Sequence, residues 1–232
     1  MYFDWTFFLL VLPAMIFAMW ANNRVNRTFE KYKNQYSVNG ISAAQAARRI
    51  LDSNGLNNVP IDLITGNLTD NYDPTANVIR LSQSVYNSTS TAAIGIACHE
   101  VGHAMQYACN YPPIKARMAI IPVTRIGSRL SVPLIIGGII LGSLSSVFTY
   151  AAYVGIALFA LSTLFQLLTL PVEMDASKRA LQQIQANGLL NESEMQSAKE
   201  VLNAAALTYV AALAVSIAQL IRFIGIVGRR RR

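Results

Sequence analysis

The chain has 232 residues, of which 53% are hydrophobic and 13% are charged, and its formal net charge is +7. Because about 25% of the residues in a soluble domain are charged, this composition indicates a membrane protein and excludes a disordered chain. The two cysteines are too few for a disulfide scaffold. The positive charge fits either nucleic-acid binding or basic cytoplasmic loops, and the apolar content favours a lipid bilayer as the partner, not nucleic acid.

Uncharged segments predict where the chain crosses a bilayer, which takes about 20 apolar residues. Residues 5–21 form the first such segment, and Asp4 is the only charge before it. A cleaved signal peptide would begin with basic residues, so we expect an uncleaved transmembrane anchor.

A second uncharged stretch of 43 residues lies between Arg129 and Glu173. This length predicts a transmembrane hairpin with spans near 130–147 and 150–170, joined by a turn around Ser145–Tyr150. The first span carries small residues that would let the two helices pack closely; these are Gly137, Gly138, Gly142 and Ser143.

The last apolar segment, 202–228, is either a fourth span or a helix partly buried in protein. The positive-inside rule sets the orientation: residues 22–129 hold eleven Lys and Arg, whereas the N-terminal tail and the turn at 146–149 hold none. We therefore expect residues 22–129 in the cytoplasm and the N-terminus outside. A complete fourth span would conflict with the rule, because it would place Arg229–Arg232 outside.

Residues 22–116 have the pattern of a small α/β unit. Ser42 and Gln45 predict a capping box at the start of a helix that Gly55 closes. The runs VPIDLIT and ANVIRLS predict two strands, with turn residues between them: Gly66, Asn67, Asp70, Asn71, Asp73 and Pro74. The segment Thr89–Thr91 offers N-caps for a further helix that runs to about Ala108.

That last helix contains the chain's two histidines, in the sequence His99-Glu100-Val101-Gly102-His103. Residues four apart share a helix face, so both imidazoles can reach one tetrahedral zinc ion. Glu100 points about 100° round the helix, where it can accept a proton from a water that zinc activates without binding the metal itself. The alternatives are two hydrogen-bonded helix histidines with no metal, and a zinc site with no catalysis.

Zinc needs a third protein ligand, which must be a carboxylate or a cysteine because there are no other histidines. Cys98 lies off the face of His99 and Cys109 lies about 15 Å further along the helix, so we expect both to be buried thiols. Glu173 follows Pro171, which we expect to fix the first turn of a new helix. We choose Glu173 as the ligand; the alternative is a carboxylate that caps that helix. The other downstream carboxylates are Asp175, Glu192, Glu194 and Glu200.

Three segments carry a family resemblance: HEVGHAMQ, the preceding YDPTANVIRLSQSVYNSTSTAAIGIAC, and LPVEMDASKRAL after the hairpin. The chain resembles the YugP-type bacterial membrane zinc metallopeptidases over about residues 2–220. The resemblance implies a gluzincin fold with His99, His103 and Glu173 on zinc and Glu100 as the general base. We expect a multi-pass protein of the bacterial plasma membrane, and the Lys and Arg distribution predicts that its active site faces the cytoplasm.

The chain is more distantly similar to the HtpX and CAAX prenyl protease group, which usually carries Asp four residues after the ligand Glu. Here that position is Ser177, and Asp175 faces nearly away from Glu173, so the residue that orients a zinc histidine stays unassigned. In gluzincins an edge strand beside the active helix pairs with the peptide. Asn77–Ser82, which includes Ile79, is the candidate, although it could be an ordinary internal strand. Arg179 and Tyr209 are candidates to stabilise the oxyanion.

We therefore expect a membrane-embedded zinc-dependent endopeptidase with one Zn²⁺ per chain, in which a metal-activated water attacks a peptide carbonyl. Its substrates would be membrane proteins or peptides near the membrane surface. The alternative is a non-catalytic, zinc-stabilised membrane scaffold or binding module, which would have no need of Glu100. No feature of the sequence specifies an oligomeric state.

The fold class that we expect is an α-helical multi-pass membrane protein with a small α/β zincin-like catalytic unit, a minimal gluzincin. A transmembrane hairpin is inserted between its zinc ligands. The expected order is an anchor (1–21), the α/β catalytic segment (22–116), the transmembrane hairpin (117–172), a helix with the third ligand (173–201), and a hydrophobic helix with a basic tail (202–232).

Overall fold

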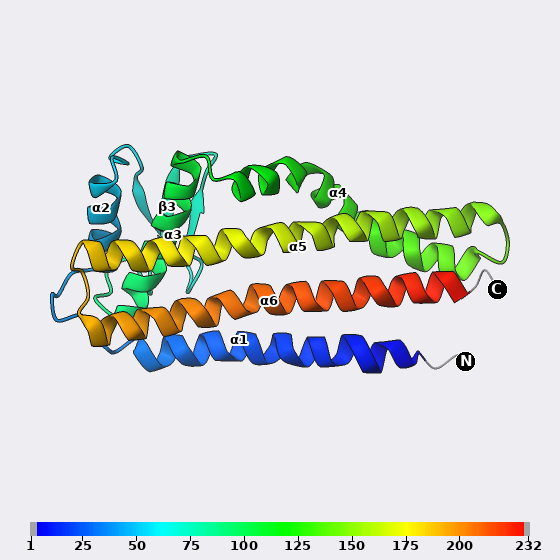
Figure 1. Cartoon of the computed structure of the whole chain (residues 1–232), viewed down its shortest axis with the longest axis horizontal. Helices are drawn as coiled ribbons and strands as arrows, with labels where there is room; N and C mark the ends of the chain where they lie inside the picture. The colour runs from blue at the N-terminus through cyan, green and yellow to red at the C-terminus, as the bar shows by residue number, and fades with distance from the viewer. Residues whose placement is uncertain (1–3, 230–232) are drawn as a thin grey trace. The chain divides into compact units, whose positions relative to one another are not determined.

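The computed structural model describes residues 4–229, which are mainly helical (Figure 1). The chain forms two compact units. The hydrophobic unit comprises Met1–Trp20, Lys115–Leu170 and Thr208–Arg232, and the sheet unit comprises Ala21–Ile114 and Pro171–Leu207. The elements are, in order, a π-helical turn η1 (Phe7–Val11), α1 (Leu12–Tyr32), α2 (Ala43–Ser53), β1 (Ile61–Ile64), β2 (Asn71–Asp73), β3 (Val78–Ser82), α3 (Thr91–Ala108), α4 (Pro112–Leu141), α5 (Ser146–Ala186) and α6 (Glu192–Arg229).

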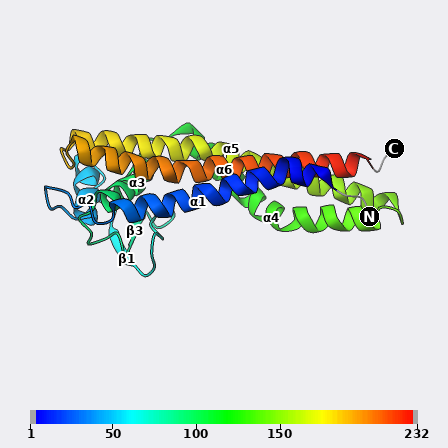
Figure 2. The same cartoon turned by 90° about the horizontal axis from the view of Figure 1, so that it is seen from below.

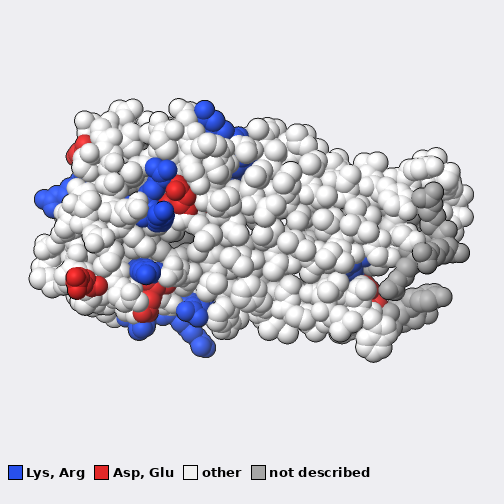
Figure 3. Space-filling model, in the orientation of Figure 1, with Lys and Arg blue, Asp and Glu red and all other residues white. Residues whose placement is uncertain are grey.

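Four helices among the described residues are long and apolar enough to cross a membrane, and they extend over Phe7–Tyr32, Pro112–Leu141, Ser146–Ala186 and Glu192–Gly228. The segment 202–228 belongs to the last of them. The face of the hydrophobic unit that Figure 3 shows carries few Lys, Arg, Asp and Glu. Large apolar side chains such as Leu9 and Ile140 are exposed there, as contact with lipid tails would require.

The turn between α4 and α5 lies earlier than we expected. α4 ends at Leu141 and α5 begins at Ser146, so the expected turn at Ser145–Tyr150 is wrong. The side chain of Ser145 accepts a hydrogen bond from the backbone N–H of Val147 at 3.3 Å, which provides a cap for the first turn of α5.

Small residues bring α4 and α5 together, as the sequence predicted for Gly138 but not for Gly155. A Cβ added to Gly138 would lie 2.5 Å from the carbonyl oxygen of Phe148, and one added to Gly155 would lie 2.7 Å from that of Ser131. A Cβ on Gly137 would meet nothing within 4 Å. The close packing therefore depends on Gly138 and Gly155 and not on Gly137.

The hydrophobic unit also contains an ion pair. Nε of Arg222 on α6 lies 2.6 Å from Oδ2 of Asp4, and the guanidinium lies over the ring of Phe7. This pair neutralises a cation inside an apolar helix and joins the end of α6 to the beginning of the described chain.

The sheet unit begins with the predicted helix α2. Ser42 and Gln45 form the expected capping box. The Ser42 hydroxyl accepts a hydrogen bond from the backbone N–H of Gln45, and the Gln45 side chain accepts one from the backbone N–H of Ser42. Ser90 caps α3. Figures 1 and 2 show α2 and α3 beside the sheet, and apolar side chains from these elements make its core, including Ile50, Leu51, Ile79, Leu81 and Ile94, none of them accessible to solvent.

The strand order is β1-β3-β2, with β1 parallel and β2 antiparallel to β3. The segment Asn77–Ser82 is therefore not an edge strand, because β3 is paired on both sides. β2 is the edge strand in contact with α3. Its residues Asn71–Asp73 were expected in a turn, since short polar edge strands share the composition of turns.

Pro171 does not begin a new helix. It lies inside α5, which continues without a break to Ala186. Glu173 is consequently a residue of a helix interior. The alternative role that we considered for it, capping a helix start, does not apply.

Candidate metal centre

The two histidines lie on one face of α3, and the opposite face fixes the helix in the core. Cys98 and Val101 are fully buried in that core, where burial raises the pKa of the Cys98 thiol. His99 and His103 therefore point to the other side, with their ring centroids 4.7 Å apart. Both side chains are largely buried and keep a small exposed fraction.

Glu173 of α5 meets these two rings. Its Oε2 lies 3.3 Å from Nε2 of His99 and 3.4 Å from Nε2 of His103. One potential ligand atom from each of the three residues lies within 4.8 Å of the others. Two imidazole nitrogens and one carboxylate oxygen form a donor set of the kind that catalytic zinc sites use. The residues present therefore fit a zinc ion.

A close approach of α3 and α5 makes this convergence possible. Gly102 lies against α5, where an added Cβ would be 2.4 Å from the carbonyl oxygen of Ala176. Only glycine at position 102 lets the backbone of α5 come near enough for Glu173 to reach His99 and His103. This explains the glycine within the HEVGH sequence.

We expect Gly102→Ala to destabilise the sheet unit, by about 1–3 kcal/mol, because the methyl group overlaps backbone atoms that cannot rotate away. Thermal unfolding of the purified protein in detergent measures the effect, and zinc content should fall with it. Gly137→Ala is the matched control, since its Cβ would meet nothing within 4 Å. An unfolding temperature for Gly102→Ala equal to that of the wild type would contradict this account of the helix contact.

Each histidine has a polar neighbour behind it. Nδ1 of His99 lies 3.1 Å from the hydroxyl of Ser177, and Nδ1 of His103 lies 3.1 Å from Oε1 of Gln106. Gln106 in turn donates to Oδ2 of Asp175. Ser177 therefore occupies the place next to His99, and Asp175 reaches the site through Gln106, although its position in sequence suggested that it would face away.

Glu100 lies beside this cluster on the side of the sheet. It is buried, and its Oε2 accepts a hydrogen bond from the backbone N–H of Tyr72 in β2 at 2.8 Å. Burial raises the pKa of the Glu100 carboxyl, while the charges of His99 and His103 act in the opposite direction. The contact with Tyr72 fixes the carboxylate without engaging Oε1.

The structure also gives the positions of the four other residues that we predicted to contact the substrate or the transition state. Arg179 is paired with Asp175, with Nε 2.6 Å from Oδ2. Oδ1 of Asn77 accepts from the Tyr72 hydroxyl at 2.8 Å, and Ile79 is fully buried in the central strand. Tyr209 lies on α6 in the hydrophobic unit. A role for these four residues with substrate stays a prediction.

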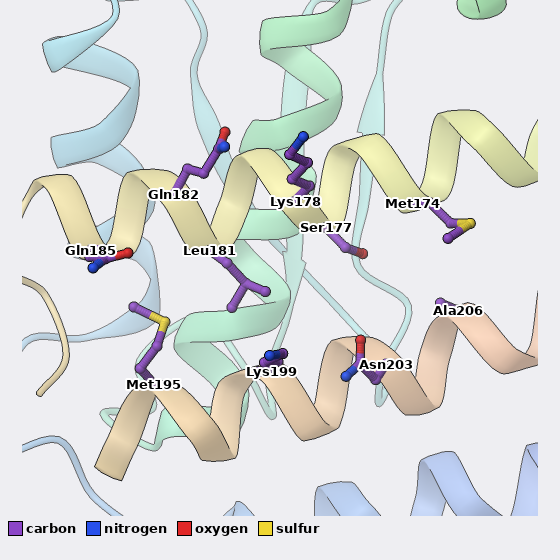
Figure 4. Close-up of a pocket in the computed structure, with 10 residues that line it drawn as sticks. All are labelled: Met174, Ser177, Lys178, Leu181, Gln182, Gln185, Met195, Lys199, Asn203 and Ala206. Atoms are coloured by element: carbon purple, nitrogen blue, oxygen red, sulfur yellow. The ribbon is translucent and has the colours of Figure 1, made fainter. Parts of the chain in front are cut away.

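A separate cavity of about 390 Å³ lies between α5 and α6 in the sheet unit (Figure 4). None of the three candidate ligands lines it. Ser177 does, and this residue therefore stands between the cavity and His99. The cavity is not the candidate metal centre.

Sequence reasoning missed three neighbours of the cluster: Gln106, Ser177 and the backbone N–H of Tyr72. Gln106 is three residues after His103 and Ser177 four residues after Glu173, so helical spacing could have placed both on the faces of the ligands. No local signal brings β2 to Glu100, because that contact depends on the tertiary fold.

These features define a class: a helical protein with four candidate membrane spans and a His–His–Glu group that could hold a metal ion. Residues 7–228 match the model of a family described as "Putative neutral zinc metallopeptidase", and the chain belongs to this family. It is 44% identical to "Putative membrane protease YugP" of Bacillus subtilis (strain 168) over 218 residues. These aligned residues cover 94% of this chain and 95% of the relative. No solved structure matches the chain.

Proposed function

We propose that the protein is a membrane-embedded zinc endopeptidase in which His99, His103 and Glu173 hold one zinc ion per chain. The observation that carries this proposal is the convergence of their three ligand atoms within 4.8 Å, beside the buried Glu100. Membership of a zinc metallopeptidase family and the name of the relative support it. When bound, zinc would supply Lewis-acid chemistry that acidifies a water molecule and polarises a peptide carbonyl.

Glu100 is the general base in this proposal. It lies next to His99 in sequence and is held by the N–H of Tyr72, so its free oxygen can accept the proton of the attacking water and later deliver it to the leaving amine. Ser177 and Gln106 hold the rings of His99 and His103 in orientation through their Nδ1 atoms.

We place the substrate beside β2 and not beside β3, which has no free edge. The N–H of Tyr72 points away from β3, toward α3. Since the N–H and C=O of one residue in a strand point to the same side, the carbonyl of Tyr72 also points away from β3. An extended substrate segment could pair there by β-augmentation, next to Glu100.

Substrates would be membrane proteins or peptides close to the membrane surface. Glu173 lies three residues after Leu170, the last residue of the hydrophobic segment Lys115–Leu170, in the same helix α5, and this closeness in sequence supports the proposal. A test of the function is whether purified protein in detergent contains about one zinc per chain and cleaves an unfolded protein in a manner that a chelator abolishes.

We also propose that the sheet unit faces the cytoplasm of a bacterial cell, on the basis of its Lys and Arg content. The pairing of Asp4 with Arg222 fits four complete spans, which would bring both chain ends to the outer side. On this view the basic C-terminal tail is an exception to the positive-inside rule, and the larger number of Lys and Arg on the cytoplasmic side sets the orientation.

Labelling with a membrane-impermeant thiol reagent tests this topology. Cys109 is exposed, so our expectation that both cysteines are buried is wrong for this one, and the test needs a Cys109→Ser background. In that background, Asn57→Cys in the sheet unit should label only after permeabilisation. Ser143→Cys, in the turn between α4 and α5, should label in intact cells. Both positions are exposed, so the reverse pattern would mean the opposite orientation.

A further inference from the structure

Gln106 is fully buried next to the candidate metal centre and has three hydrogen-bonding neighbours. Its Nε2 donates to the carbonyl oxygen of Val172 at 2.7 Å and to Oδ2 of Asp175 at 2.8 Å. Its Oε1 lies 3.1 Å from Nδ1 of His103. Both hydrogens of the amide nitrogen thus have a partner, and so does the amide oxygen.

This arrangement fixes which way the amide faces. A backbone carbonyl and a carboxylate can only accept hydrogen bonds, so the group that faces them must be the donor, Nε2. The opposite orientation would put Oε1 against two acceptors in a site closed to water, which is costly. Oε1 must therefore face His103.

The orientation of the amide decides the protonation of the ring. Because Oε1 only accepts, Nδ1 of His103 must carry a hydrogen, and the metal must then bind through Nε2. Nε2 is the atom that lies 3.4 Å from Glu173. The hydroxyl of Ser177 next to His99 can donate or accept, so the neighbour of His99 imposes no such choice.

Asp175 is itself held in place. Nε of Arg179 lies 2.6 Å from the same Oδ2 that accepts from Gln106, and the guanidinium lies over the ring of Tyr111. Arg179 therefore holds the acceptor of Gln106 in place, while its role at the oxyanion stays a prediction.

We propose that Gln106 is a positioning residue that sets the tautomer of His103, and that Asp175 and Arg179 fix the orientation of Gln106. The inference rests on the proposed function only in that His103 binds the metal. It assigns the residue that orients a zinc histidine, for which the sequence offered no carboxylate.

Two substitutions separate this role from simple packing. Gln106→Met keeps the length of the side chain but removes the acceptor. Gln106→Glu keeps an acceptor for Nδ1 and, when protonated between Asp175 and Val172, also a donor. A packing role predicts that Met is tolerated better than Glu in this buried position, whereas the tautomer role predicts that Glu is tolerated better.

The readout is the zinc dissociation constant of the purified protein, measured by competition with a chromophoric chelator. Gln106→Met should weaken zinc binding about 10–100-fold, the usual effect of losing such a partner, and Gln106→Glu should lie closer to the wild type. Asp175→Asn should also weaken zinc binding. An asparagine amide can donate a hydrogen bond, so it would also accept a Gln106 amide turned by 180°, with Nε2 instead of Oε1 facing His103. Gln182→Met, on an exposed position of α5, is the matched control and should have no effect.

A spectroscopic readout is independent of affinity. The chain has two histidines, so protein labelled with ¹⁵N-histidine gives ring signals from two residues only. In the zinc-loaded wild type, one Nδ1–H signal that belongs to His103 should be protected from solvent exchange, and Asp175→Asn should lose this protection even where Gln106→Met fails to fold.

Equal zinc affinity in the wild type and Gln106→Met would overturn this inference and leave the proposed function standing. A signal showing that Nδ1 of His103 binds the metal would do the same. A wild type that binds no zinc would overturn the metal site of the proposed function together with it. A wild type that binds zinc but shows no peptidase activity would leave the inference standing and count against the proposed reaction.

Discussion

Replacing Glu100 by Gln should lower peptidase turnover by about 10² or more, the range expected when a positioned proton acceptor is lost. A general base is needed only for the chemical step, whereas the ligands hold the metal. Gln has nearly the same shape as Glu and can still accept the hydrogen bond from the N–H of Tyr72. Zinc content and unfolding temperature should therefore stay at the values of the wild type.

Cleavage of an unfolded protein in detergent measures this effect, with a chelator-treated sample as the background. If the protein is a non-catalytic scaffold, neither form will cleave. Turnover by Glu100→Gln as fast as that of the wild type would exclude Glu100 as the base, whatever the metal content.

Loss of any one of the three candidate ligands should abolish stable zinc binding. His99→Ala, His103→Ala and Glu173→Ala each leave two donors, too few for the three protein ligands that catalytic zinc sites use. Glu173 is almost completely buried between the two rings, so no water-exposed carboxylate can take its place. Metal analysis of the purified variants measures the loss.

Glu192→Ala is the matched control for Glu173→Ala, because Glu192 is an exposed carboxylate in the first turn of α6. It should keep the zinc content of the wild type. Full zinc in Glu173→Ala together with loss of zinc in Asp175→Ala would show that the third ligand has been assigned to the wrong carboxylate.

The parts of the fold that sequence predicted well are set by local patterns. The capping box of Ser42 and Gln45, the cap of α3 at Ser90 and the apolar helices each depend on residues close together in the chain. The common face of His99 and His103 follows from helical periodicity alone. The lack of another histidine limits the third ligand to a carboxylate or a cysteine, and we choose Glu173 because it follows Pro171. The structure brings Glu173 to both rings, although Pro171 does not begin a helix.

The parts that sequence could not predict depend on contacts between distant segments. Asn71–Asp73 has the composition of a turn and becomes a strand only because β3 offers it a partner. Pro171 suggested a helix start, yet α5 passes through it. Two of the three neighbours of Gln106, Val172 and Asp175, lie on α5, 66 and 69 residues further along the chain, and no periodicity relates them to Gln106.

The measurement that tests the central claim most directly compares membranes from cells that produce the wild type with membranes from cells that produce Glu100→Gln. Protein N-termini are sequenced across the whole proteome, so that a narrow specificity cannot hide the activity. We predict new N-termini near the cytoplasmic membrane surface in the wild type only, at sites that the purified, zinc-loaded protein also cleaves and that a chelator protects. Identical N-termini in the two samples, with full zinc in both proteins, would contradict the account.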